Sequence, residues 1–116
     1  MMSDLPHQWE IWHARFDFSE GHGYEFRPVL VIDSAVSSML VAMITSATNQ
    51  LSLPHDCIIE DWGEAGLIKP SLVRLDRIVE IPIAYIGTSE RIGNLSPNDI
   101  VRVVSLLPDL LPAAED

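Results

Sequence analysis

Arg27 stands directly before Pro28–Ile32, a stretch in which four uninterrupted apolar residues follow a proline. Such a run predicts a short strand buried on both faces. Because proline has no N–H, we expect Pro28 at the first position of that strand. A polar loop of glycine, histidine and acidic residues (19–25) precedes Arg27. A guanidinium fixed beside such a loop suits an anionic ligand such as phosphate, although Arg27 could equally cap a sheet edge or pair with a carboxylate.

A small set of polar side chains could complete a site around Arg27. The candidates are His22, Thr45, Ser46, Arg74 and Asp76. Residues two apart on a strand share a face, so we expect Arg74 and Asp76 to lie side by side. They form either an ordinary ion pair or an acid–base couple in which arginine stabilises a charged, phosphorane-like transition state. The two hydroxyls at a strand end are either turn features or hydrogen-bond donors to a phosphate oxygen.

Several other kinds of chemistry find no support in the sequence. It contains no phosphate-cradling glycine loop, no nucleophile elbow and no His/Cys set with zinc spacing. The four histidines are scattered, and metal sites need converging ligands, so we expect neither a metal nor a cofactor. Cys57 is the single cysteine, which excludes an internal disulfide, fits a reducing cytoplasm and predicts a buried, inert thiol.

The composition predicts one globular domain. The chain has 116 residues, of which 47% are hydrophobic and 21% charged. We expect a flexible N-terminus (1–8), a single domain (9–112) and an acidic tail (113–116), without a signal peptide or a membrane span. Seven basic residues face seventeen acidic ones, a net charge of −10, which excludes a general polyanion binder. Any RNA would have to be held by a few concentrated arginines.

The pattern of apolar residues favours a mainly β protein. It predicts strands at 9–16 (with a bend or bulge), 28–32, 40–45, 55–60, 72–81 (two short strands or one long bent one) and 91–95, with a helical turn at 61–66. Trp9 and Trp12 are expected to fill the core or an interface rather than to stack bases. Short strands with one terminal helix indicate a small, strongly bent sheet or a partly open barrel.

A C-terminal helix is predicted from its start signal. Ser96 would be the N-cap, with Pro97 at the first helical position and Asp99 at the third. The apolar residues at 3–4 spacing should face the core; these are Ile100, Val103, Val104, Leu107 and Leu111. We expect the helix to stop or kink at Pro108.

Six segments, in this order, resemble the MazF/PemK/Kid family of type II toxin–antitoxin ribonucleases. They are Trp9–Trp12, Gly21–His22, Arg27–Ile32, Ile44–Ser46, Gly66–Asp76 and Ile92–Ser96. The resemblance implies an SH3-like partly open barrel with a C-terminal helix, acting as a cytoplasmic homodimer. It implies metal-independent, sequence-specific cleavage of single-stranded RNA, in which the ribose 2′-hydroxyl attacks the adjacent phosphate to give 2′,3′-cyclic phosphate and 5′-hydroxyl ends. It also implies a cognate antitoxin whose disordered tail lies across the RNA groove.

The same resemblance assigns roles by motif position. Arg27 matches the catalytic arginine that stabilises or protonates the phosphoryl group, and Thr45 matches its hydroxyl partner. Arg74 and Asp76 match the acid and the base of the Kid branch. The RNA-binding residues would be His22, Ser46 and Glu20.

Two functions therefore remain open. The first is an endoribonuclease toxin, which is favoured by the joint presence of Arg27, Thr45, Arg74 and Asp76. The second is a non-catalytic barrel of the same fold, similar to the gyrase-poisoning toxins, that binds a protein partner; the strongly acidic charge favours it. A small-molecule enzyme has no supporting motif.

Overall fold

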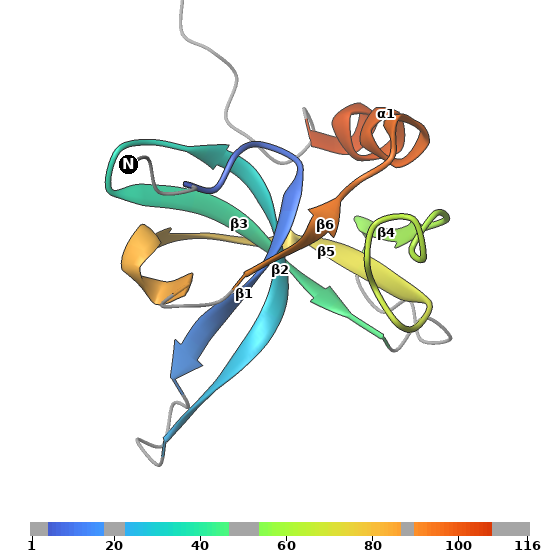
Figure 1. Ribbon diagram of the computed structural model, residues 1–116. Coiled ribbons are helices and arrows are strands. Elements are labelled where there is room, and N and C mark those ends of the chain that lie inside the picture. Colours follow the sequence, from blue (N-terminus) through green and yellow to red (C-terminus); the bar gives the residue numbers. More distant parts are fainter. Residues whose placement is uncertain (1–4, 18–22, 47–53, 87–89, 108–116) are drawn as a thin grey trace, which may run out of the picture.

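Six strands form one curved antiparallel sheet, and a single α-helix follows near the C-terminus (Figure 1). The computed structural model describes residues 5–17, 23–46, 54–86 and 90–107. The strands are β1 (Glu10–Asp17), β2 (Tyr24–Ser34), β3 (Ser38–Thr45), β4 (Asp56–Ile59), β5 (Ser71–Pro82) and β6 (Arg91–Asn94). A 3₁₀ turn, η1 (Ile83–Ile86), and the helix α1 (Pro97–Leu106) complete the elements. The predicted mainly β class with a small α part is confirmed.

The order β4-β5-β3-β2-β1-β6 leaves β4 and β6 as the two edges of the sheet. The barrel is therefore open rather than closed, as expected from the short strands and the single helix. Within the described residues, no helix is long and apolar enough to cross a membrane.

Strand β2 connects two hydrophobic clusters that lie on opposite faces of the sheet. Leu30 and Ile32 belong to the first cluster, against which parts of α1 pack, whereas Val29 and Val31 belong to the second, which includes Ile86 of η1. This alternation confirms that the run after Pro28 is buried on both faces. Figure 1 shows α1 and η1 on opposite sides of the sheet, where each covers one cluster.

Strand β2 begins earlier than the sequence suggested. Residues 24–26 were expected to be part of a loop, yet they pair with the end of β1, where Tyr24 lies opposite Asp17. The Tyr24 and Phe26 rings meet edge to face at 6.0 Å, and the Arg15 guanidinium lies 4.4 Å from the Tyr24 ring centre. The cross-strand contact of Arg15 with Tyr24, together with the Tyr24–Phe26 contact along β2, extends the hairpin in spite of its polar composition.

Pro28 is consequently not the first residue of its strand, and that prediction is wrong. It is the fifth residue of β2 and lies opposite His13 of β1. The register with β3 starts only at Val29, so the missing N–H of Pro28 interrupts no residue pair with β3.

Bulges bend two strands where the sequence allowed for a bend. The register of β1 against β6 shifts between Ile11 and Trp12, which confirms the expected irregularity. Of the two alternatives for residues 72–81, the single bent strand is correct: Ala42 pairs with Ile78, but Met43 already pairs with Arg74. Residues 75–77 therefore form a bulge, which sharply re-aims the side chains there.

The start of α1 follows its predicted capping pattern. The Ser96 hydroxyl accepts a hydrogen bond from the Asp99 N–H at 3.2 Å, and Pro97 is the first helical residue. Asp99 itself is 1% exposed and accepts the backbone N–H groups of Glu60 and Asp61, both at 2.9 Å. The helix is thereby fastened to the segment that follows β4.

One predicted core position in α1 is wrong. Val103 is fully buried and Ile100 and Leu107 pack against the first cluster, but Val104 is 45% exposed. The helix contacts the sheet through a narrow stripe, and Val104 lies one residue around the helix from its centre. Leu111 and Pro108 lie outside the described residues.

Residues 60–67 fold back over the sheet and reach β6. Hydrogen bonds from the Ala65 N–H to the Asp61 carbonyl and from the Leu67 N–H to the Trp62 carbonyl, both 3.0 Å, confirm the predicted turn. A side chain on Gly66 would clash with the Ile92 backbone, and one on Gly93 with the Ala65 backbone. Glycine at both positions lets the two backbones approach closely, which builds one wall of the groove described below.

Candidate active site

A groove of about 960 Å³ opens between the β1–β2 hairpin and the segment 66–71. Its apolar floor includes Pro28, Ile44 and Leu67. Three of the seven basic residues of the chain line it: Arg27, Lys69 and Arg91. Glu90 is the one acidic residue among its lining residues. Three cations therefore line the groove against one acidic residue, while Glu25 and Glu10, outside the lining, pair with Arg27 and Arg91.

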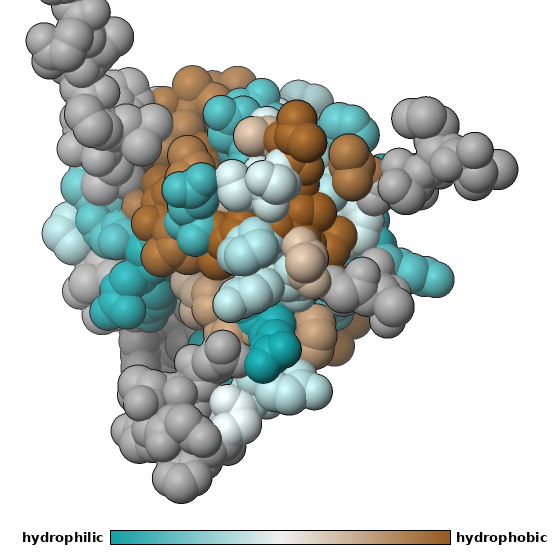
Figure 2. Space-filling model, turned by 90° about the vertical axis from the view of Figure 1, so that its left-hand side faces the viewer, coloured by the Kyte–Doolittle hydropathy of each residue, from teal (hydrophilic) through white to brown (hydrophobic). Residues whose placement is uncertain are grey.

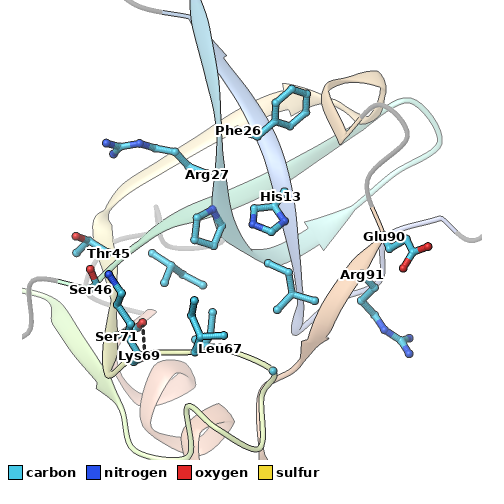
Figure 3. A pocket seen from close by; sticks show the side chains of 15 residues that line it. His13, Phe26, Arg27, Thr45, Ser46, Leu67, Lys69, Ser71, Glu90 and Arg91 are labelled. Atoms are coloured by element: carbon cyan, nitrogen blue, oxygen red, sulfur yellow. Dashed lines mark hydrogen bonds between the residues drawn. The ribbon is translucent and has the colours of Figure 1, made fainter.

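The polar groups of the groove lie on two sides of it (Figure 3). On one side, Arg27 lies near Thr45, Ser46 and Lys69, and on the other lie Glu90 and Arg91. His13 is the exception among the polar groups, because its ring lies between these two sides, as does the apolar side chain of Leu67. A ligand that fits this groove would carry anionic groups and flat or apolar groups together.

Strand register places three of the predicted site residues on one face of the sheet. Val29 of β2 pairs with Met43 of β3, so Arg27 and Thr45, each two residues further toward the same end of the sheet, share the face of that pair. Met43 also pairs with Arg74 of β5. Arg27, Thr45 and Arg74 thus come from three adjacent strands, although they are far apart in the sequence.

Arg27 has a carboxylate partner on its own strand. Its Nε donates to Glu25 Oε2, and its side chain is 49% exposed. The alternative that Arg27 pairs with a carboxylate is therefore what the structure contains. The pair also leaves half of the Arg27 side chain open to solvent, so the guanidinium stands at the rim of the groove.

Arg74 is held from the neighbouring edge strand. Its Nη1 donates to Oδ2 of Asp56 at 3.1 Å, and the Asp56 side chain is 1% exposed. Asp56 lies directly opposite Arg74 in the β4–β5 register. An ion pair fixes the Arg74 side chain, but the carboxylate that it contacts is Asp56 of β4, whereas the sequence predicted Asp76 as its neighbour.

Asp76, in the β5 bulge, is bound twice by His55. One oxygen accepts the His55 backbone N–H at 2.8 Å, and the other lies 2.9 Å from His55 Nδ1. Desolvation raises the pKa of Asp76, but these hydrogen bonds and the charges of His55 and Arg77 outweigh it, so that its pKa lies below the ordinary value of 3.8. Asp76 is therefore ionised at neutral pH.

The far side of the groove is stabilised through Glu10. This buried carboxylate accepts the Trp12 indole N–H at 2.9 Å, the His7 N–H at 2.8 Å and Arg91 Nη1 at 3.2 Å. Burial opposes the charge, but the hydrogen bonds from Trp12, His7 and Arg91 lower the pKa of Glu10 below 4.5. Glu10 thus ties Arg91 to the start of β1.

Two tryptophans and the lone cysteine have the roles that the sequence suggested. Trp12 is buried in the second cluster, and Trp9 packs against the first, which confirms core positions rather than a base-stacking platform. Cys57 is buried, and desolvation raises the pKa of its thiol. A raised pKa makes the reactive thiolate scarce, in line with the expected inertness.

Sequence reasoning missed four residues that contribute to this region: His55, Asp56, Lys69 and Arg91. The first two depend on the β4–β5 register, which no local pattern reveals. Lys69 and Arg91 line opposite sides of one groove only because the segment 65–66 approaches β6 closely. Ser46 lies at the groove, as expected. His22 and Glu20 lie outside the described residues. Among the residues that the structure describes, no cluster of His, Cys, Asp or Glu could hold a metal ion.

Comparison with sequence families supplies the decisive observation. The profile of the PemK-like, MazF-like toxins of type II toxin–antitoxin systems matches residues 7–111. The chain belongs to this family. The predicted resemblance is thereby confirmed, and it extends over nearly the whole barrel and the helix. Comparison with curated protein sequences gave no match.

Solved structures similar to this PemK/MazF-like chain share its fold at low sequence identity. MazF in the MazE–MazF complex from Deinococcus radiodurans superimposes with a TM-score of 0.73 at 17% identity, covering 93% of this chain and 96% of that one. An endoribonuclease from Mycobacterial species gives 0.70 at 12% identity, covering 98% and 100%. Another from Mycobacterial species, in complex with its cognate antitoxin, gives 0.66 at 14% identity, covering 97% and 100%.

Proposed function

We propose that this chain is the toxin of a type II toxin–antitoxin system and a sequence-specific, metal-independent endoribonuclease that cuts single-stranded RNA. The observation that carries the proposal is the gathering of Arg27, Thr45 and Arg74 on one face of three adjacent strands, beside the Asp76–His55 pair. Family membership supports the same activity, since two of the structurally similar proteins are endoribonucleases.

The chemistry that suits these groups is attack by the ribose 2′-hydroxyl on the adjacent phosphate. The O2′–P bond forms, the P–O5′ bond breaks, and the products are a 2′,3′-cyclic phosphate and a 5′-hydroxyl. Arg27 would stabilise the negative charge on the phosphoryl oxygens, and the Thr45 hydroxyl would donate to one of them. Arg74 would stabilise the departing O5′, which takes its proton from water, because a guanidinium stays protonated.

The base side of the reaction lies at Asp76. Hydrogen bonds from His55 keep this carboxylate ionised, and its fixed negative charge favours removal of the 2′-hydroxyl proton at the Asp76–His55 pair. The reaction needs neither a protein nucleophile nor a redox group, so the absence of an elbow motif and the buried state of Cys57 are compatible with it.

The distribution of charge is compatible with RNA binding in spite of the net charge of −10. Phosphate binding depends on local cations, and the groove gathers Arg27, Lys69 and Arg91 around its rim. The apolar floor between them, including Pro28 and Leu67, offers a surface for unpaired bases. A single strand with exposed bases fits this combination better than a duplex does.

The remaining family expectations form part of the same proposal. Two copies would assemble into a homodimer, and a cognate antitoxin would cover the groove with an extended segment. Similar proteins from Mycobacterial species and Deinococcus radiodurans form toxin–antitoxin complexes. His22, Glu20 and Ser46 are proposed to contact the RNA.

The test is incubation of the purified protein with a long RNA at low salt, followed by mapping of new 5′-hydroxyl ends. Arg27→Ala is the test variant, and Arg15→Ala is the matched control: it removes the same charge from the same hairpin, but from the face opposite to Arg27. We expect discrete cuts that disappear with Arg27→Ala and persist with Arg15→Ala. Absence of cuts from a folded wild-type protein would refute the proposal in favour of the non-catalytic barrel.

A further inference from the structure

We infer that His55 is the group that takes the proton from the RNA 2′-hydroxyl, and that Asp76 acts through it as a positioning residue. The inference rests on the proposed function and names a further residue of the same site. Within the described residues, His55 and His7 are the histidines whose rings lie against a carboxylate, and the partner of His55 is Asp76, two residues along β5 from Arg74.

The geometry of the pair fixes the ring. Asp76 holds the backbone of His55 through one oxygen at 2.8 Å and the ring Nδ1 through the other at 2.9 Å. An ionised carboxylate at Nδ1 favours the tautomer with hydrogen on that nitrogen. The second ring nitrogen, Nε2, then carries the lone pair that a general base requires.

The position of the pair suits this role. His55 immediately precedes Asp56, which holds Arg74 at 3.1 Å. Both ion pairs therefore connect β5 to the same two consecutive residues, His55 and Asp56. The side chains of His55 and Asp76 are each 22% exposed, so the site is sheltered yet within reach of a ligand.

The electrostatic surroundings favour transfer to the imidazole rather than to the carboxylate. Asp76 accepts hydrogen bonds at both oxygens, and its pKa is lowered by His55 and Arg77, so the carboxylate is a weak base. When the imidazole takes a proton, the adjacent carboxylate stabilises the imidazolium that forms. In the balanced step, the 2′-hydroxyl proton goes to His55 Nε2, O2′ bonds to phosphorus, and the P–O5′ bond breaks. O5′ takes a proton from water, and the hydroxide that remains takes the proton back from the imidazolium.

A set of variants distinguishes a general base at His55 from a purely structural role of the His55–Asp76 pair. His55→Asn can still donate a side-chain N–H to Asp76, but it has no basic nitrogen. His55→Ala leaves a gap that imidazole added to the buffer can enter. His7→Asn is the matched control, because His7 also lies against a carboxylate, Glu10 Oε2 at 3.5 Å, at the start of β1.

We expect His55→Asn and His55→Ala to lose about 10²–10⁴-fold in cleavage rate, the usual contribution of a general base. Imidazole should restore much of the rate of His55→Ala, with saturation, and should leave His55→Asn and wild type unchanged. His7→Asn should keep the wild-type rate. Circular dichroism of each variant checks that the fold is intact.

A double-mutant cycle separates this role of Asp76 from that of a direct base. If Asp76 acts through His55, Asp76→Asn lowers the rate of the wild type strongly, yet adds little to His55→Ala. Full activity of His55→Asn, failure of imidazole to raise the rate of folded His55→Ala, or equal losses from Asp76→Asn in both backgrounds would overturn the inference. Because these measurements use cuts made by the wild type, a wild type that makes none refutes the proposed function itself.

Discussion

Two aspartates hold the two ends of β4, and they do so in different surroundings. Asp99 accepts the N–H groups of Glu60 and Asp61 after the strand, and Asp76 accepts the N–H of His55 before it. The Asp99 side chain is 1% exposed and is also bound by Arg102 of its own helix. The Asp76 side chain is 22% exposed, and its second oxygen meets an imidazole.

The difference shows how one interaction can serve structure at one end of a strand and chemistry at the other. At Asp99 every partner is a fixed donor within the packed junction of α1 and β4. At Asp76 the second oxygen meets an imidazole ring, and both side chains are 22% exposed. The comparison predicts that a change at Asp99 lowers stability and that a change at Asp76 lowers the proposed cleavage activity.

The largest effect is expected from Asp76→Asn. It keeps the shape of the side chain but removes the charge that orients His55, so the cleavage rate should fall about 10²–10⁴-fold. Its urea unfolding midpoint should stay close to that of the wild type, because the side chain is partly exposed and the amide oxygen can still accept the His55 N–H. A large loss of stability with unchanged cleavage per folded molecule would reverse the assignment.

Asp99→Ala should show the opposite pattern. It removes the buried carboxylate that accepts the Glu60 and Asp61 N–H groups, and we expect a loss of about 2–4 kcal/mol in the free energy of unfolding, at roughly 1–2 kcal/mol for each of the two lost hydrogen bonds. Urea unfolding followed by tryptophan fluorescence measures it. Under conditions where the variant is folded, its cleavage rate should match the wild type; a catalytic defect there would mean that α1 takes part in the site.

Glu10→Gln extends the comparison to a third carboxylate, which is buried and hydrogen-bonded. The pKa of Glu10 is lowered in the folded protein, so its charge contributes stability above pH 4.5, and this contribution is lost as the pH falls through the folded value. We expect the variant to be less stable than the wild type at pH 7 and the two to converge toward pH 3. Parallel stability curves across that range would contradict this account of Glu10.

The smallest effect is expected from removal of metal ions. The described residues offer no metal cluster, and the proposed chemistry uses guanidinium, hydroxyl and imidazole groups alone. Dialysis against EDTA, with the ionic strength held constant, should leave the rate of RNA cleavage unchanged. Loss of cleavage that returns on adding Mg²⁺ would replace the imidazole base with a metal-bound water.

Much of the fold could be read from local patterns. Three features follow from residues that are close together in the sequence: the two-sided burial of 29–32, the Ser96 cap and the irregularity of β1. The early start of β2 at Tyr24 was missed, because the Arg15–Tyr24 and Tyr24–Phe26 contacts stabilise a strand whose composition resembles a loop.

Only some of the residues of the candidate site could be predicted from the sequence. Arg27, Thr45, Arg74 and Asp76 were chosen by motif position, and the structure brings the first three to one face through strand register. His55 was dismissed as one of four scattered histidines, because its pairing with Asp76 spans 21 residues and depends on the β5 bulge. The pairing register between strands that are far apart in the sequence cannot be predicted from a single sequence.

The most direct test of the account uses two RNA oligonucleotides that carry a mapped cleavage sequence. One is all-ribose, and the other has a single 2′-deoxy substitution at the nucleotide on the 5′ side of the cut. If the 2′-hydroxyl is the nucleophile, the first is cut to a 2′,3′-cyclic phosphate and the second is bound but left intact. Cleavage of both at equal rates would contradict the mechanism and require water or a protein group as the nucleophile.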